Sequence, residues 1–157
     1  MGLTHLFNQL RHTVPWNSLM NRMLEELHIQ GRSVDDIAEF LKRVPLHPHV
    51  IAVIKSAYAL GCDLKVVSDA NLFYIKTILE HYGVHDCFSE ITNPAVVDSG
   101  RLRIFPYHEA ASSHGYDLCP PNFCKVLQFC TFEFFCLFVC LFFFGSAFCS
   151  SVVRCFN

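Results

Sequence analysis

Apolar residues recur every three or four positions along much of the first 82 residues, which is the spacing of helices that bury one face. This spacing predicts helices over residues 16–29, 34–44, 48–60 and 71–82. Residues that begin or end helices stand at the boundaries, namely Pro15, Gly31, Pro45, Pro48, Gly61 and Gly83. Ser33 and Asp36 form a capping-box pattern before the second helix. The chain up to residue 45 is therefore predicted to be wholly helical.

A second pattern, short apolar runs bounded by small polar residues, predicts strands. Residues 62–67 form such a run and lie between the last two predicted helices. The order helix, strand, helix is half of a doubly wound α/β unit. Farther on, residues 91–97 and 101–105 flank the turn-forming segment Asp98–Gly100, which indicates a hairpin. The sequence thus predicts an α/β fold to which the first 45 residues add a helical layer.

Length and charge narrow the class of protein. A chain of 157 residues has room for one domain of ordinary size. The formal net charge is −2 and no basic block occurs, so nucleic acid is not an expected partner. The first residues lack the continuous apolar core of a secretory signal. We therefore expect residues 1–125 to be cytoplasmic, with reduced cysteine thiols.

The composition changes abruptly after Lys125. Residues 126–157 hold ten of the sixteen Phe and five of the nine Cys, with Glu133 and Arg154 as their only charges. The stretch 131–153 is about as long as a helix that crosses a bilayer, so one interpretation is a C-terminal membrane anchor. The other interpretation, which we favour, is that thymine-rich non-coding sequence was translated, as in a retained intron or a gene-model fragment.

The run VVSDAN at residues 66–71 ends the predicted strand on polar side chains. In open α/β sheets, ligands bind at the carboxyl ends of strands, where helix N-termini present N–H groups. In that interpretation Ser68 and the backbone N–H groups of residues 69–71 bind a phosphate, and Asp69 and Asn71 face the rest of the ligand. The alternative is that Asp69 or Asn71 caps the following helix. The spacing alone favours the cap.

Possible metal ligands are crowded into one loop, namely His108, His114, Cys119 and Cys124. Imidazoles and thiolates suit tetrahedral Zn²⁺, so a structural zinc site is one hypothesis. Their spacing matches no standard zinc finger, and unligated loop residues are the favoured alternative. Lys125 follows directly. It is either a cation that neutralises an anionic substrate or a solvated surface lysine.

Several segments spread over residues 5–125 carry a family resemblance. They are LFNQLRHTVPWNSLMNRMLEELHIQG, RVPLHPHVIAVIKSAYALGCDLKVVSDANLFYIKTILEHYGV, RIFPYH and SHGYDLCPPNFCK. Together they resemble the phosphoethanolamine/phosphocholine phosphatase family of the haloacid dehalogenase superfamily, above all its plant thiamine phosphate phosphatase-like and inorganic pyrophosphatase-like members. The resemblance implies a partial Rossmannoid phosphatase core at residues 46–125, a helical cap at residues 1–45 and a hydrophobic tail.

The resemblance also implies a chemistry. The family consists of Mg²⁺-dependent phosphatases that form an aspartyl-phosphate on an aspartate nucleophile. By motif matching, Ser68 would hold the transferring phosphoryl group and Lys125 would offset negative charge. Asp69 and Asn71 would lie in the pocket for a small phosphorylated metabolite, and the cap would close over that pocket.

Two motifs that the resemblance leads us to expect do not occur in the sequence: the Asp-x-Asp nucleophile motif and a Gly-Asp-Gly metal motif after Lys125. We therefore expect this chain to bind no Mg²⁺ and to be catalytically incompetent. The resemblance places Met1 inside the cap, so we also expect the strand at 62–67 to be left with exposed edges. A membrane-anchored, non-catalytic remnant that binds a phosphorylated ligand is the alternative from another class.

Overall fold

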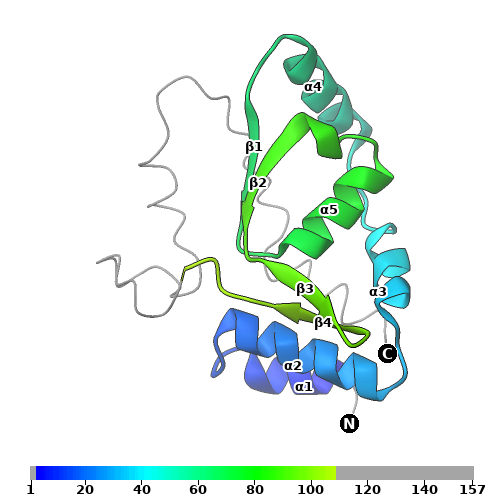
Figure 1. Cartoon of the computed structure of the whole chain (residues 1–157), viewed down its shortest axis with the longest axis vertical. Helices are drawn as coiled ribbons and strands as arrows, with labels where there is room; N and C mark the ends of the chain where they lie inside the picture. Colours follow the sequence, from blue (N-terminus) through cyan, green and yellow to red (C-terminus); the bar gives the residue numbers. More distant parts are fainter. Residues whose placement is uncertain (1–2, 109–157) are drawn as a thin grey trace.

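The computed structural model describes residues 3–108, which form a mixed α/β structure (Figure 1). Its helices are α1 (Leu3–Leu10), α2 (Trp16–Ile29), α3 (Val34–Leu41), α4 (Pro48–Ala59), α5 (Leu72–His81) and the short 3-10 helix η1 (His85–Cys87). Its strands are β1 (Leu64–Ser68), β2 (Phe88–Thr92), β3 (Ala95–Asp98) and β4 (Arg101–Ile104). The helices predicted from apolar spacing are confirmed: residues 16–29 match α2 at both ends, and the ends of the other three differ by at most three residues.

The helix boundaries follow the local signals. Gly31, with φ of +77°, ends α2 in a conformation that side chains with a Cβ rarely adopt. The predicted capping box is confirmed: Ser33 Oγ accepts from the backbone N–H of Asp36, and the Asp36 carboxylate accepts from the backbone N–H of Ser33 at 2.8 Å. This last hydrogen bond, above other causes, holds the pKa of Asp36 below its ordinary value.

Strands β1 and β2 lie parallel and in register from Leu64 opposite Phe88 to Ser68 opposite Thr92. Helix α5 connects them, so β1, α5 and β2 form a βαβ unit. The apolar side chains of β1 pack with α4 and α5 into the main core, which includes Val66 and Ile75 at 0 % exposure. In Figure 1 both strands point away from α4 and end next to the first turn of α5.

Two of the strand predictions are wrong. Residues 91–97 are not one strand, because β2 and β3 are separated by Asn93 and Pro94. Proline has no N–H to donate to a ladder, so the apolar residues on either side of it belong to different sheets. The expectation that the edges of β1 are exposed is also wrong for one of its two edges, since β2 pairs along the full length of β1.

The predicted hairpin is confirmed. Strands β3 and β4 are antiparallel, with Asp98 opposite Arg101. The two residues between them, Ser99 and Gly100, have φ values of 51° and 75°. Positive φ at both central residues is typical of the type I′ turn, whose twist matches that of the flanking strands.

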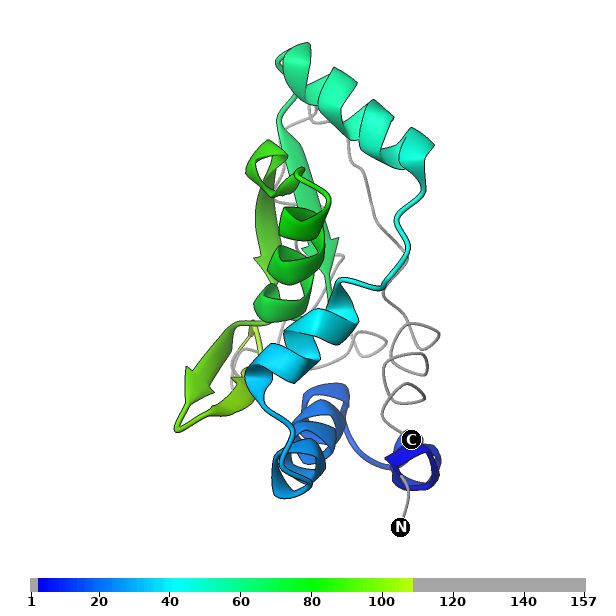
Figure 2. The ribbon, with the colours of Figure 1, turned by 90° about the vertical axis from the view of Figure 1, so that its right-hand side faces the viewer.

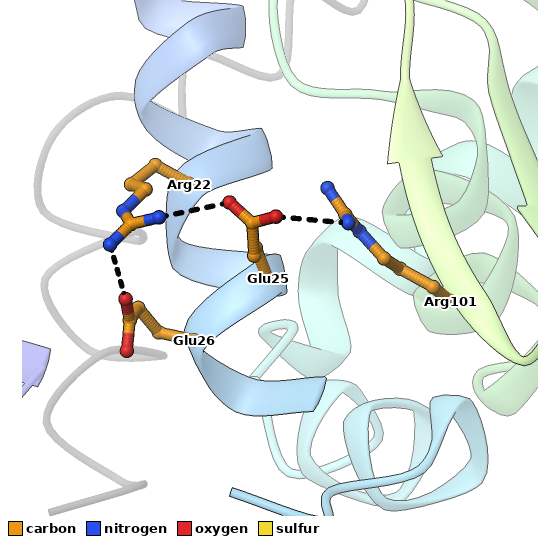
Figure 3. Close-up of polar contacts among 4 residues, drawn as sticks. All are labelled: Arg22, Glu25, Glu26 and Arg101. Atoms are coloured by element: carbon orange, nitrogen blue, oxygen red, sulfur yellow. Dashed lines mark hydrogen bonds and ion pairs between the residues drawn. The ribbon is translucent and has the colours of Figure 1, made fainter. Parts of the chain in front are cut away.

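The hairpin packs against the helical layer, an arrangement that the sequence analysis did not foresee. The Asn21 side chain on α2 donates to the Ile104 carbonyl at 2.7 Å and accepts from the Ile104 N–H at 2.8 Å, as a neighbouring strand would. Glu25 accepts from Arg101 at 3.1 Å and also pairs with Arg22 (Figure 3). Helix α2 therefore covers the outer edge of β4.

Figures 1 and 2 together show two parts along the long axis of the described residues. One part holds α4, the β1–β2 pair and α5, and the other holds α1, α2 and the β3–β4 hairpin. The carboxyl ends of β1 and β2 face the second part. Tyr82 at the end of α5 helps to fix the segment that links α3 to α4, because its hydroxyl donates to the Val44 carbonyl at 2.8 Å and accepts from Leu46 N at 3.2 Å.

Within residues 3–108, none of the helices has the length and apolar character that a bilayer crossing requires. The stretch 131–153, which we considered as a membrane anchor, lies outside the described residues.

Asn21→Ala should lower the free energy of unfolding by about 1–3 kcal/mol, because it leaves the Ile104 N–H and carbonyl without their partner. Arg22→Ala is the matched control on the same helix. It removes only exposed ion pairs and should cost less than about 1 kcal/mol. Urea denaturation of the 157-residue chain measures both, and equal losses in the two variants would contradict the role given to Asn21.

Candidate functional site

Buried polar side chains gather where β1 and β2 end. Ser68, Asn71, Thr92 and Asn93 are exposed by 2 %, 1 %, 6 % and 0 %, and we refer to these four residues as the strand-end cluster. Polar groups removed from water cost free energy unless they are hydrogen-bonded, so a cluster of this kind has to be explained by structure or by function.

Ser68 is the last residue of β1. Its Oγ accepts a hydrogen bond from the backbone N–H of Ala70 at 3.2 Å. This bond turns the chain out of the strand and toward α5. It also means that one of the backbone N–H groups expected to bind phosphate is used to hold Ser68 itself.

Asn71 is the N-cap of α5. Its Oδ1 accepts from the backbone N–H of Tyr74 at 3.0 Å, which satisfies one of the donors left open at a helix start. The capping alternative raised by VVSDAN is therefore correct for Asn71. The cap also places the positive end of the α5 dipole beside the last residues of β1 and β2.

Asn93 connects three segments. Its Nδ2 donates to the carbonyls of Asp69 and Ala70 at 2.8 and 3.0 Å. Its backbone carbonyl accepts from Leu72 N at 2.9 Å, and its Oδ1 accepts from Tyr107 N at 3.1 Å. The turn after Ser68, the first turn of α5 and the chain that follows β4 are thus held by one residue, through its amide side chain and its backbone carbonyl.

The other predicted site residues fall in different places. Asp69 is half-buried in the turn after β1. His108 lies at the end of the described residues, with its ring 5.1 Å from that of Tyr107. The remaining candidates, His114, Cys119, Cys124 and Lys125, lie outside the described residues.

Metal ligation finds no support in the part of the chain that is described. Among residues 3–108, no group of three or more His, Cys, Asp or Glu side chains is placed to hold a metal ion. The zinc hypothesis, which needs three residues beyond 108, stays a prediction.

Sequence reasoning missed Thr92 and Asn93. A signal was present in the order of residues: after Ile91, the polar residues Thr92 and Asn93 come directly before Pro94, much as three polar residues end VVSDAN. Extending one predicted strand from Ile91 to Val97 hid that second polar strand end.

The family model described as "Putative Phosphatase" matches residues 1–133. The chain belongs to this haloacid dehalogenase-like phosphatase family. The match includes every described residue and ends within the phenylalanine-rich stretch. The family assigned by resemblance is thereby confirmed, and the strand-end cluster can be examined as part of a phosphatase-family chain.

The names of curated relatives agree with this family assignment. The chain is 58 % identical over 130 residues to inorganic pyrophosphatase 2 of Arabidopsis thaliana, covering 81 % of this chain and 47 % of the relative. It is also 58 % identical to a thiamine phosphate phosphatase-like protein of the same plant, covering 81 % and 53 %. The human phosphoethanolamine/phosphocholine phosphatase is 31 % identical, with 70 % and 41 % covered. The chain thus spans about half the length of these relatives. No solved structure matches it significantly.

Asn93→Asp should destabilise this phosphatase-family chain by about 3 kcal/mol or more, because it replaces two donated hydrogen bonds with a buried carboxylate facing two carbonyl oxygens. Hydrogen exchange at the Leu72 amide should accelerate as well, since that amide donates to the Asn93 carbonyl. Ser89→Ala, at an exposed position of β2, is the control and should stay within about 0.5 kcal/mol of the parent. We refer to the hydrogen bonds of Asn93 to these three segments as the Asn93 clamp. Unchanged stability of Asn93→Asp would contradict the structural role of this clamp.

Proposed function

We propose that this chain is the cap and part of the core of a phosphatase that acts on a small phosphorylated metabolite or on pyrophosphate, and that Ser68 holds the phosphoryl group. The proposal rests above all on Ser68, a buried hydroxyl at the carboxyl end of a parallel strand beside the N-terminus of α5, in a chain of a phosphatase family.

The hydrogen bonds around Ser68 support this role. Because Oγ already accepts from the Ala70 N–H, the hydroxyl proton is directed to another acceptor, and a phosphoryl oxygen is a strong one. The α5 dipole adds a favourable potential for an anion at this position. Lys125, matched to the family's lysine motif, is our candidate for the cation that offsets the remaining negative charge.

Substrate selection is assigned to two regions. Asp69 lies in the half-buried turn next to Ser68, and we propose that it and Asn71 line the pocket for the rest of the substrate. The strand ends face α2 and the β3–β4 hairpin, so this second part is suited to act as the cap that limits substrate size (Figure 1). The relatives are named for pyrophosphate, thiamine phosphate, and phosphoethanolamine or phosphocholine, and we propose a small substrate of this kind. We also propose that residues 1–125 act in the cytoplasm.

We further propose that the 157-residue chain binds phosphate without turning over substrate. Its sequence contains no Asp-x-Asp motif to supply a nucleophile. Losing a nucleophile removes several orders of magnitude in rate while leaving binding groups in place. Holding a phosphoryl group and attacking it are thus separable in this chain.

Thermal unfolding of the 157-residue chain in increasing inorganic phosphate tests the binding. Phosphate should raise the unfolding temperature, and Ser68→Ala should weaken phosphate binding roughly tenfold or more, the effect of one hydrogen bond to a charged group. Ser89→Ala is the matched serine control. A phosphate effect that is absent, or equal in Ser68→Ala, would overturn the proposal.

Turnover is measured separately with Mg²⁺ and either pyrophosphate or p-nitrophenyl phosphate. The parent chain should release no phosphate above the buffer rate. Turnover that disappears in Ser68→Ala would show instead that this chain has a nucleophile we have not identified.

A further inference from the structure

Thr92 carries the least explained hydroxyl of the strand-end cluster. The residue is 6 % exposed, and its Oγ1 is buried without a hydrogen-bond partner in the part of the chain described. A threonine hydroxyl left unsatisfied in this way costs about 1–3 kcal/mol. Valine has nearly the same shape, favours strands equally and would avoid that cost. A position with a purely structural role would therefore be better filled by valine.

The register brings this hydroxyl next to Ser68. Ser68 and Thr92 are direct partners across the parallel pair. Partners in a parallel ladder present their side chains on the same face, and neighbouring strands are about 4.8 Å apart. The Leu72 N–H donates to the Asn93 carbonyl at 2.9 Å, which draws the first turn of α5 against the residue that follows Thr92. Both hydroxyls therefore lie side by side at the N-terminus of α5.

Three backbone donors at this end are already engaged. The N–H of Ala70 bonds Ser68 Oγ, that of Leu72 bonds the Asn93 carbonyl, and that of Tyr74 bonds Asn71 Oδ1. The helix start is therefore largely satisfied by the protein itself. An anion bound here has to be held to a greater extent by side-chain hydroxyls than at an uncapped helix start.

We propose that Thr92 is a second phosphate-binding residue, whose hydroxyl donates to an oxygen of the same phosphoryl group that Ser68 holds. The inference rests on the function proposed for Ser68. Each hydroxyl donates one hydrogen bond, and a phosphoryl group offers several acceptor oxygens, so one group can accept from both strands. The hydroxyl of Thr92 then gains a hydrogen-bond partner when the phosphate binds. The free energy that the unpaired hydroxyl costs the free protein is recovered on binding and strengthens the affinity.

Thr92→Val, Thr92→Ala and Thr92→Ser in the 157-residue chain test this inference by thermal unfolding with and without inorganic phosphate. Thr92→Val should unfold at the same temperature as the parent or a higher one when phosphate is absent, because it removes an unsatisfied polar group. The same variant should bind phosphate roughly tenfold more weakly. Thr92→Ser keeps the hydroxyl and should keep most of the affinity.

Thr77→Val, in the middle of α5, is the matched threonine control and should leave phosphate binding unchanged. Thr92→Ala provides a second variant without the hydroxyl if Thr92→Val does not fold. Unaltered phosphate affinity in both would overturn the role of Thr92 while leaving that of Ser68 intact. A lower unfolding temperature of Thr92→Val with unaltered affinity would assign the hydroxyl to the structure. If neither the parent chain nor Ser68→Ala responds to phosphate, the proposed function fails, and the inference on Thr92 fails with it.

Discussion

The arrangement of the strand ends depends on one amide side chain, that of Asn93. It is fully buried, and its Nδ2 holds the carbonyls of Asp69 and Ala70 while its Oδ1 holds the N–H of Tyr107. The chain leaves the βαβ unit for the hairpin at this residue, and Tyr107 follows the hairpin. A single residue therefore fixes the segment before the hairpin, the segment after it and the turn that follows Ser68. Phe105 N, which donates to the Pro94 carbonyl at 2.8 Å, ties the same two segments together.

This clamp explains why polar residues are tolerated at the centre of the molecule. In the turn after β1 the carbonyls of Asp69 and Ala70 are not paired within a strand or helix, and Asn93 supplies the donor that they need. Asn71 and the Asn93 carbonyl do the same for the N–H groups at the start of α5. Among the strand-end residues the hydroxyls are the groups least used by the fold itself. The two amides thus make most of the structural hydrogen bonds, and the protons of the two hydroxyls are the groups that we propose bind the ligand.

Local signals in the sequence were enough for much of this structure. Pro15, Ser33, Asn71 and Gly83 each act over a few residues, and the helices that they bound were predicted closely. Ser68 was found because three polar residues interrupt an apolar run. The Asn21–Ile104 pairing was not predictable, since its partners are 83 residues apart and nothing in an amphipathic helix identifies which polar side chain completes a distant strand edge. Asn93 was missed because one strand was predicted across Pro94, and its four hydrogen bonds join segments that are distant in the sequence.

The two interpretations of VVSDAN, a helix cap and a phosphate site, are compatible once the side chains are assigned one by one. Capping α5 occupies Asn71 Oδ1 and the Tyr74 N–H, and it does not involve the Ser68 hydroxyl proton. The Asn71 N-cap also supports a binding role, because it fixes the start of α5 and its dipole next to Ser68 before any anion binds. Asn93, the Asn71 N-cap and the turn after Ser68 already hold these groups in place. Binding of an anion would therefore cost little conformational entropy. The phosphate-holding site that we propose can therefore persist in a chain whose sequence lacks the Asp-x-Asp nucleophile motif.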